Sequence, residues 1–114
     1  MNILFTAKGK EWDSPMDPRF GRAMYLLVYN TVSDKMDVID NSAVDEEAHG
    51  AGTKTSSVVA GIAPDIIITG NGPGGNAASV LAATGVKLYT GAGEMKVEEA
   101  YNAWKNNLLE EFKF

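Results

Sequence analysis

The sequence predicts an α/β fold: a mixed five-stranded sheet with helices on both faces, in the element order β-β-β-α-β-α-β-α. The first forty residues contain short apolar or alternating segments separated by turn residues, a pattern typical of strands and hairpins. From residue 41 onward, helical patterns alternate with short β-branched segments, which is typical of parallel strands joined by crossover helices. The 114-residue length fits one domain, predicted over residues 1–110, with residues 111–114 as a loose tail.

Five short apolar segments are predicted as strands. The first, at the N-terminus, is almost continuously apolar and is expected near the centre of the sheet. The turn residues Ser33-Asp34-Lys35 join the second and third segments into an antiparallel hairpin. The fourth contains the unbroken β-branched run Ile66-Ile67-Ile68, typical of a strand covered on both faces. The five predicted strands are 2–7, 25–29, 36–40, 66–69 and 86–89.

Three further segments are predicted as helices. Gly52 or Thr53 can cap the first helix, Pro73 suits the first position of the second, and Gly85 suits a left-handed C-cap after it. The third has an apolar stripe at helical spacing, formed by Val97, Ala100, Tyr101, Trp104 and Leu108. The predicted helices are 53–61, 73–84 and 95–110.

The composition excludes several classes of function. The 10 basic and 15 acidic residues give a net charge of −5, which argues against nucleic-acid partners and anionic membranes. The absence of cysteine excludes disulfides, thiolate nucleophiles and a metal or iron–sulfur site held by thiolates. The N-terminus lacks the apolar run of a signal peptide, and no segment approaches the roughly 18 apolar residues of a membrane span. A cytoplasmic protein is the expectation.

Three segments are expected to meet beyond the carboxyl ends of the parallel strands, where open α/β sheets bind ligands. They are the long loop 8–22, the segment 49–53 that leads into the first helix, and the glycine-rich turn 70–76. The turn offers main-chain amides at a helix N-terminus, where an anion is favoured. It matches neither a dinucleotide fingerprint nor a Walker loop, and a tight structural turn is the alternative.

Two arginines flank an aromatic residue and a glycine in the loop, as Arg19-Phe20-Gly21-Arg22. Two guanidiniums can clamp an anionic ligand through charge-assisted hydrogen bonds. In the alternative, Phe20 fills the core and both arginines pair with acidic residues, as surface charges commonly do. The acidic candidates are Asp13, Asp17 and the run 45–47.

His49 is the single histidine of the chain and the strongest candidate metal ligand. A closed metal site needs about four ligands, so one imidazole with scattered carboxylates supports at most a weak, open or shared site. The alternative is a solvated acidic loop that carries a histidine.

No catalytic constellation stands out, and a non-enzyme is predicted. The sequence has no cysteine, one histidine and no Gly-x-Ser-x-Gly elbow. The element order resembles that of ribonuclease-H-type nucleases, whose metal-binding carboxylates sit on the central strands. The first strand here has no carboxylate, and Asp65 lies at the start of the fourth strand rather than its end. Two-metal phosphodiester chemistry is therefore unsupported.

Four segments together resemble the dinitrogenase iron-molybdenum cofactor biosynthesis family, also described as nitrogenase accessory factor-like. The likeness covers about 105 residues and lies in the order and spacing of the segments, as in single-domain members. The segments are Arg19-Phe20-Gly21-Arg22-Ala23, His49-Gly50-Ala51-Gly52, the run from Asp65 to Gly74, and Gly85-Val86-Lys87-Leu88-Tyr89.

The resemblance implies a ribonuclease-H-like fold without nuclease activity. It also implies a carrier, chaperone or scaffold that transiently binds an iron–sulfur or iron–molybdenum type cluster or its precursor, with cluster-donor or acceptor proteins as partners. Family members often have histidine where this chain has Arg19. A guanidinium cannot ligate a metal at neutral pH, but it can neutralise an anionic cluster.

The expected ligand is therefore an anionic metallocluster. Two alternatives remain open: a sensor or binding module for a small phosphorylated or carboxylated metabolite at the same place, and a protein-interaction module that uses the exposed edge of the strand 36–40. The expected cofactor-binding residues, with His49 as the metal ligand, are Arg19, Phe20, Gly21, Arg22, His49, Gly50, Gly52, Gly70, Asn71, Gly72 and Gly74.

Overall fold

The computed structural model of the chain describes residues 1–42 and 51–114. In this part of the chain the strands are β1 (Asn2–Ala7), β2 (Tyr25–Asn30), β3 (Lys35–Asp40), β4 (Ile66–Ile68), β5 (Lys87–Thr90) and β6 (Glu110–Glu111). The helices are α1 (Ala51–Ile62), α2 (Gly75–Ala82) and α3 (Val97–Lys105). None of these helices is long and apolar enough to cross a membrane.

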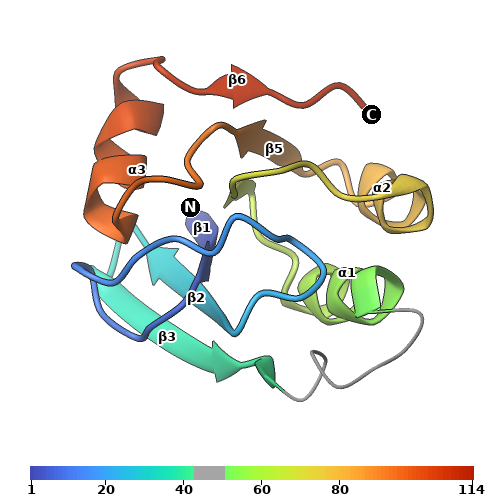
Figure 1. Cartoon of the computed structure of the whole chain (residues 1–114), viewed down its shortest axis with the longest axis horizontal. Coiled ribbons are helices and arrows are strands. Elements are labelled where there is room, and N and C mark those ends of the chain that lie inside the picture. Colours follow the sequence, from blue (N-terminus) through green and yellow to red (C-terminus); the bar gives the residue numbers. More distant parts are fainter. Residues whose placement is uncertain (43–50) are drawn as a thin grey trace.

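The strands form one mixed sheet in the order β3-β2-β1-β4-β5-β6. The central strands β1, β4 and β5 are parallel, whereas β2, β3 and β6 are antiparallel to their neighbours. Figure 1 shows α1 and α2 on one side of the sheet and α3 on the other. The predicted α/β class, the mixed sheet and the helices on both faces are therefore confirmed.

The predicted number of five strands is wrong, because the C-terminal segment adds β6 to the edge of the sheet. The predicted helix 95–110 ends at Lys105, and Asn107 adopts a left-handed conformation with φ 58° that turns the chain. Glu110–Glu111 then pairs with β5, and the Phe112 amide donates to the Leu88 carbonyl at 2.7 Å. Leu108, expected in the apolar stripe, is 74% exposed.

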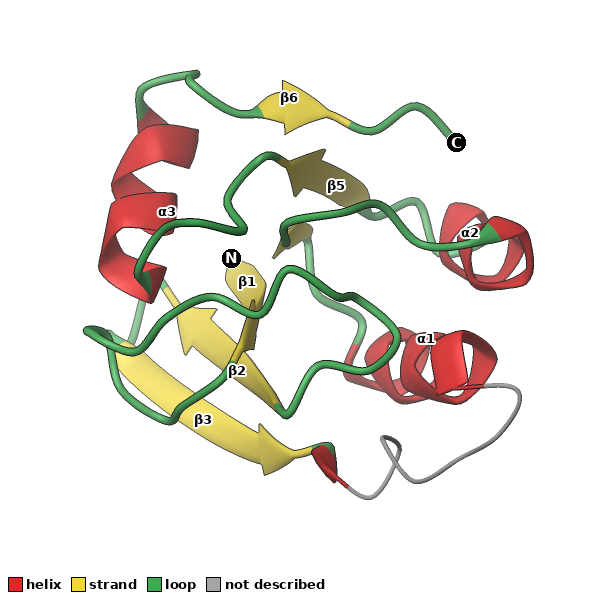
Figure 2. Cartoon of the chain, viewed as in Figure 1, coloured by secondary structure: helices red, strands yellow, loops and turns green. Residues whose placement is uncertain are grey.

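Two apolar layers cover the two faces of the sheet. Figure 2 shows the helices that lie over each face. Alternate residues of one strand point to opposite faces, so β1 contributes Leu4 to one layer and Ile3 and Phe5 to the other. The layer under α1 and α2 includes Leu26, Val59, Ile67, Leu81 and Leu88. The layer under α3 includes Leu27, Ile66, Ile68, Val97 and Ala100.

Main-chain hydrogen bonds hold the long loop 8–22 in place across its length. The Lys8 amide donates to the Pro15 carbonyl at 2.9 Å, and the Met16 amide donates to the Met95 carbonyl at 2.9 Å. The Val97 amide, at the start of α3, donates to the Ser14 carbonyl at 2.9 Å. The loop is therefore tied both to itself and to the segment that enters α3.

Candidate functional site

A pair of buried threonines joins the two central parallel strands where they end. Thr6 Oγ1 and Thr69 Oγ1 lie 2.7 Å apart, and Thr6 Oγ1 also donates to the Asp17 carbonyl at 2.9 Å. A hydroxyl has one proton, so Thr69 is the donor in the contact between the threonines. The Asp17 amide returns a hydrogen bond to the Thr6 carbonyl at 2.8 Å. The loop 8–22 is thus fixed directly over the ends of β1 and β4.

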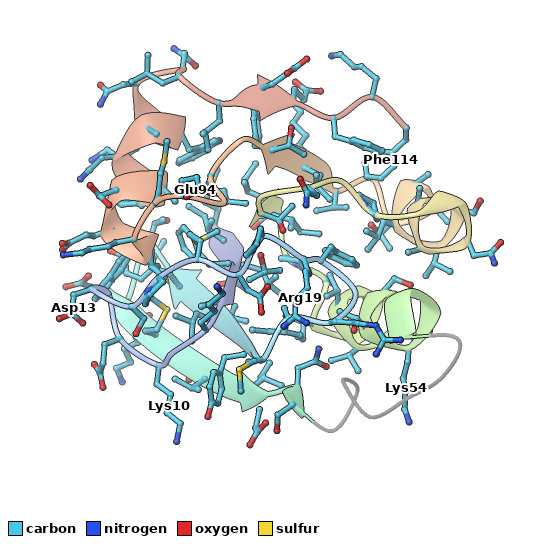
Figure 3. All side chains as sticks on the ribbon, viewed as in Figure 1. Lys10, Asp13, Arg19, Lys54, Glu94 and Phe114 are labelled. Carbon is cyan, nitrogen blue, oxygen red and sulfur yellow. The ribbon has the colours of Figure 1, made fainter. Side chains whose placement is uncertain are left out.

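Asp17 is a fully buried carboxylate, and it binds the Arg19 guanidinium. Arg19 Nε lies 3.1 Å from Asp17 Oδ1, and one terminal nitrogen of Arg19 donates to Asp17 Oδ2 at 3.2 Å. The same carboxylate accepts the main-chain amides of Arg19 at 3.0 Å and Met24 at 3.3 Å. Figure 3 shows Arg19 in the loop, between β2 and α1.

This ion pair changes the expected role of Arg19. Two of its nitrogen atoms, predicted to face an anionic ligand, instead satisfy a buried charge that would be costly if unpaired. The alternative interpretation of the sequence, in which Arg19 pairs with Asp17, is confirmed. The same holds for Phe20, which is 3% exposed and packs in the layer under α1 and α2.

The loop 8–22 packs directly against Gly70 and leaves no space for a side chain at this position. A Cβ built on Gly70 would lie 2.5 Å from Pro18 Cα and 2.9 Å from Gly93 Cα. The Asn71 amide donates to the Pro18 carbonyl at 2.8 Å, and the Gly70 carbonyl accepts from the Gly91 amide at 3.0 Å. Gly70 therefore serves close packing, and the Asn71 amide is already used within the protein.

Further along the turn, packing gives way to open space. A Cβ on Gly72 would lie 2.6 Å from the ring of Phe112, whereas a Cβ on Gly74 would meet nothing within 4 Å. Gly74 is the N-cap of α2, with an extended backbone at φ −68° and ψ 172°. Within the described residues, the amides of Gly72 and Gly74 have no hydrogen-bond acceptor. Both residues are exposed, so their amides are main-chain donors that remain available to an anion.

The second half of the arginine segment contacts α1. The Gly21 carbonyl accepts a hydrogen bond from Thr55 Oγ1 at 2.6 Å. Buried Asn41 donates from Nδ2 to the Ala23 carbonyl at 2.9 Å and to Thr55 Oγ1 at 3.2 Å. Arg22 is half-buried and lies between these two anchored neighbours in the loop. The loop 8–22 therefore contacts α1 on one side and the turn that begins at Gly70 on the other. The loop 8–22, the turn 70–74 and the start of α1 are together called the strand-end surface.

The candidate metal ligand His49 and its neighbour Gly50 lie outside the described residues. Gly52 is in the first turn of α1. In the described ranges 1–42 and 51–114, no group of three or more His, Cys, Asp or Glu side chains could hold a metal ion. The described residues therefore offer a metallocluster hydrogen bonds and charge rather than a group of metal ligands.

Sequence reasoning missed Thr6, Thr69 and Pro18, and it named Asp17 only as one of several alternative partners for the arginines. A signal existed for the threonines, because each ends an otherwise apolar, buried strand run at the carboxyl side. No sequence signal distinguished the buried Asp17 from the exposed acid Asp13.

These features define the class of the protein: an open-sheet α/β protein whose parallel strands end beneath a fixed loop and a glycine-rich turn. The family described as dinitrogenase iron-molybdenum cofactor matches residues 1–107. The chain belongs to this family, which confirms the resemblance seen in its sequence. None of the curated proteins matches the chain.

Two solved structures are similar to this chain over nearly all of its length. The apo form of the orange protein from Desulfovibrio gigas is 29% identical, with a TM-score of 0.89, and the match covers 97% of this chain and 92% of that one. A candidate NifB protein from Thermotoga, of the DUF35 family, is 33% identical, with a TM-score of 0.81 and coverage of 99% and 97%.

Proposed function

We propose that this protein is a non-catalytic carrier for an anionic metallocluster of the iron–sulfur or iron–molybdenum type, or for its precursor. The observation that carries the proposal is the family match, which extends over residues 1–107 and therefore includes every segment of the strand-end surface. The likeness to the orange protein, whose solved structure is described as an apo form, supports a protein that binds and releases a ligand.

The donor set of the chain supports a cluster held mainly by hydrogen bonds and charge. The sequence has no thiolate and one imidazole, so a cluster bound here must bring most of its own ligands. The amides of Gly72 and Gly74 would donate to its anionic atoms, at the N-terminal end of α2. Arg22 would add positive charge, and His49 would supply the one direct bond to metal.

In this proposal Arg19 acts on the site through the loop rather than through the cluster. The buried Asp17 neutralises much of its charge, and the pair fixes the loop beside Gly70 and Asn71. Weak, non-thiolate binding suits a protein that passes its cluster on, so a cluster-donor and a cluster-acceptor protein are the proposed partners.

The test is anaerobic incubation of the protein with ferrous iron, sulfide and molybdate, followed by gel filtration. We expect a coloured complex of fixed metal content to elute with the protein. His49→Ala should bleach or shift its visible absorption, whereas Asn102→Ala, an exposed change on α3, should leave it unaltered. A spectrum unchanged by His49→Ala would exclude the imidazole as a ligand. Failure of the wild-type protein to retain any metal would contradict the carrier function.

A further inference from the structure

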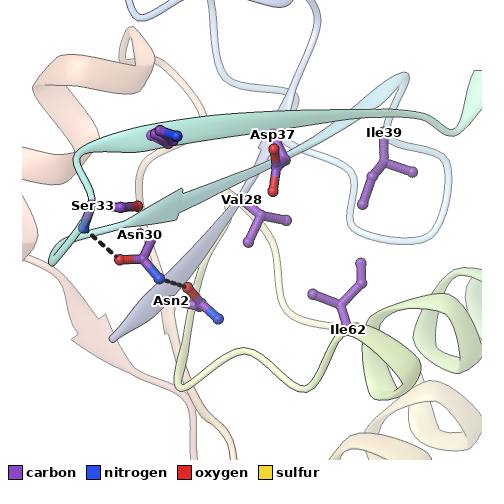
Figure 4. Close-up of a pocket in the computed structure, with 8 residues that line it drawn as sticks. Asn2, Val28, Asn30, Ser33, Asp37, Ile39 and Ile62 are labelled. Atoms are coloured by element: carbon purple, nitrogen blue, oxygen red, sulfur yellow. Dashed lines mark hydrogen bonds between the residues drawn. The ribbon is translucent and has the colours of Figure 1, made fainter.

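A groove of about 410 Å³ begins at the end of the sheet opposite to the strand-end surface, at Asn2, and runs along the β2–β3 hairpin to Ile39. Its floor is formed by β1, β2 and β3, and Ile62 at the end of α1 forms one wall. Figure 4 shows the side chains that line it. The volume is within the range of about 300–1,000 Å³ that is typical of small-molecule sites.

Strand register gives the groove a polar end and an apolar end. Asn2, Asn30 and Lys35 are cross-strand neighbours and form the polar end. Asp37 lies opposite Val28 on the next rung of the same face, and Ile39 follows on the one after that. Ile39 and Ile62 both pack against the apolar layer under α1 and α2. A ligand lying along β3 would therefore meet polar groups first and branched apolar side chains last.

Some polar groups of the groove form hydrogen bonds within the protein, and others remain available to a ligand. Asn30 Oδ1 accepts the amides of Val32 and Ser33, each at 2.9 Å, and Asn30 Nδ2 donates to Asn2 Oδ1 at 2.9 Å. This arrangement fixes the Asn2 amide and leaves its Nδ2 as a donor into the groove. Among the described residues, the exposed side chains of Lys35 and Asp37 have no hydrogen bond or ion pair.

We propose that this groove binds a small zwitterion with an aliphatic side chain, of the class of the free branched-chain amino acids. Lys35 and Asp37 lie two residues apart on one face of β3, a spacing of about 7 Å, so one α-amino acid group can reach both. Its carboxylate would bind Lys35 and Asn2 Nδ2, and its ammonium would bind Asp37. Its side chain would cover Val28, Ile39 and Ile62.

Because the groove has one positive and one negative side chain, a ligand with a single charge fits it less well than a zwitterion. A fatty carboxylate would satisfy Lys35 but would place its own charge or its apolar chain beside Asp37. An alkyl amine would satisfy Asp37 and be repelled by Lys35. A zwitterion pairs both groups at once, and its apolar side chain uses the remaining wall of the groove. The proposal does not depend on the carrier function of the other end of the sheet.

The test is an NMR titration of the full chain with L-leucine. We expect saturable shifts of the methyl groups of Val28, Ile39 and Ile62 and of the side-chain amide of Asn2. Isocaproate, which lacks the ammonium, and isopentylamine, which lacks the carboxylate, should each bind about tenfold more weakly, because one charged hydrogen bond is lost. Glycine, which lacks the apolar chain, should also bind more weakly.

Charge-neutral variants identify the two groups. Lys35→Gln and Asp37→Asn should each weaken leucine binding by about tenfold, and Asp37→Asn should improve the binding of isocaproate relative to leucine. Lys87→Gln on β5 is the matched control and should leave the affinity unchanged. Absence of saturable shifts, shifts centred on other residues, or isocaproate binding as tightly as leucine to the wild-type protein would each overturn the proposal.

Discussion

The two ends of the sheet use their charged groups in opposite ways. At the strand-end surface, the Asp17 carboxylate and the Arg19 guanidinium satisfy each other and fix the loop. At the groove, Lys35 and Asp37 lie side by side along β3 and are exposed. The difference shows that a charged motif at the carboxyl ends of parallel strands can be structural, whereas an alternating edge strand can leave two charges exposed.

Among the changes that test this contrast, we expect removal of the Asp17 carboxylate to have the largest effect on stability. Asp17→Ala removes the acceptor of two main-chain amides and of the Arg19 guanidinium, and it opens a buried space. We expect the free energy of unfolding to fall by about 2–4 kcal/mol. Denaturant-induced unfolding, followed by far-ultraviolet circular dichroism, measures this change.

Arg19→Ala provides the control for that variant. Arg19→Ala removes the half-exposed cation but leaves the buried Asp17 carboxylate its two main-chain donors, so it should cost less than Asp17→Ala, about 1–2 kcal/mol. If Asp17→Ala proved as mild as Arg19→Ala, the buried carboxylate would not be what holds the loop.

Most of the fold could be predicted from the sequence because its signals are local. The unbroken run Ile66-Ile67-Ile68 marks a covered strand, and the turn residues 33–35 mark the hairpin between β2 and β3. The C-terminal strand could not be predicted, because β6 has two residues and depends on the left-handed turn at Asn107 and on its pairing with β5.

For the candidate site, the sequence could predict only which segments lie close together. That the loop 8–22 and the turn after β4 lie together follows from the topology of parallel strands. The partner that each side chain binds cannot be predicted in this way, because it depends on contacts between residues that are distant in the sequence. Gly70 illustrates this limit, since only the position of Pro18 shows that it is needed for packing rather than for anion binding.

The second prediction contrasts two glycines of the same turn. Gly70→Ala should lower the free energy of unfolding by about 1–3 kcal/mol, because its Cβ would collide with the backbone of Pro18 and Gly93. Gly74→Ala should change it by less than about 0.5 kcal/mol, because its surroundings are open and the gain from a less flexible unfolded chain is offset by the poorer N-cap preference of alanine. Thermal and denaturant unfolding of both variants test the pair, and equal effects would contradict the packing described for Gly70.

The third prediction concerns the groove. Lys35→Gln and Asp37→Asn should each change the free energy of unfolding by less than about 0.5 kcal/mol, because neither charge has a partner among the described residues to lose. A cost well above that value would mean that the two charges stabilise the fold, and the contrast between the two ends of the sheet would disappear.

The smallest effect that we expect is a loss of stability at high pH, caused by ionisation of a tyrosine in the hairpin beside the groove. The Tyr29 hydroxyl donates to Asp34 Oδ1 at 2.7 Å, and this hydrogen bond, with burial and the Asp34 charge, raises the pKa of Tyr29 from 10.0 to about 12. The protonated phenol is favoured in the folded state, so its contribution to stability is complete below pH 10.0 and is lost as the pH rises through about 12.

Spectrophotometric titration of tyrosinate should therefore show, at about pH 12, a signal that is smaller by one tyrosine in Tyr29→Phe than in the wild-type protein. Tyr29→Phe should also flatten the fall in stability over the same pH window. If the late transition persisted in Tyr29→Phe, it would belong to another tyrosine.

The central claim is that main-chain amides at the strand-end surface bind an anionic cluster, and Gly74 allows the most direct test. Its φ of −68° already suits proline, so Gly74→Pro removes the amide proton with little change in backbone, while Gly74→Ala retains it. Anaerobic titration of both variants with preassembled iron–sulfide–molybdate species, followed by visible absorption, compares their affinities. The account predicts that Gly74→Pro binds about tenfold more weakly than Gly74→Ala, whose affinity equals that of the wild type. Equal affinity of the proline and alanine variants would contradict it.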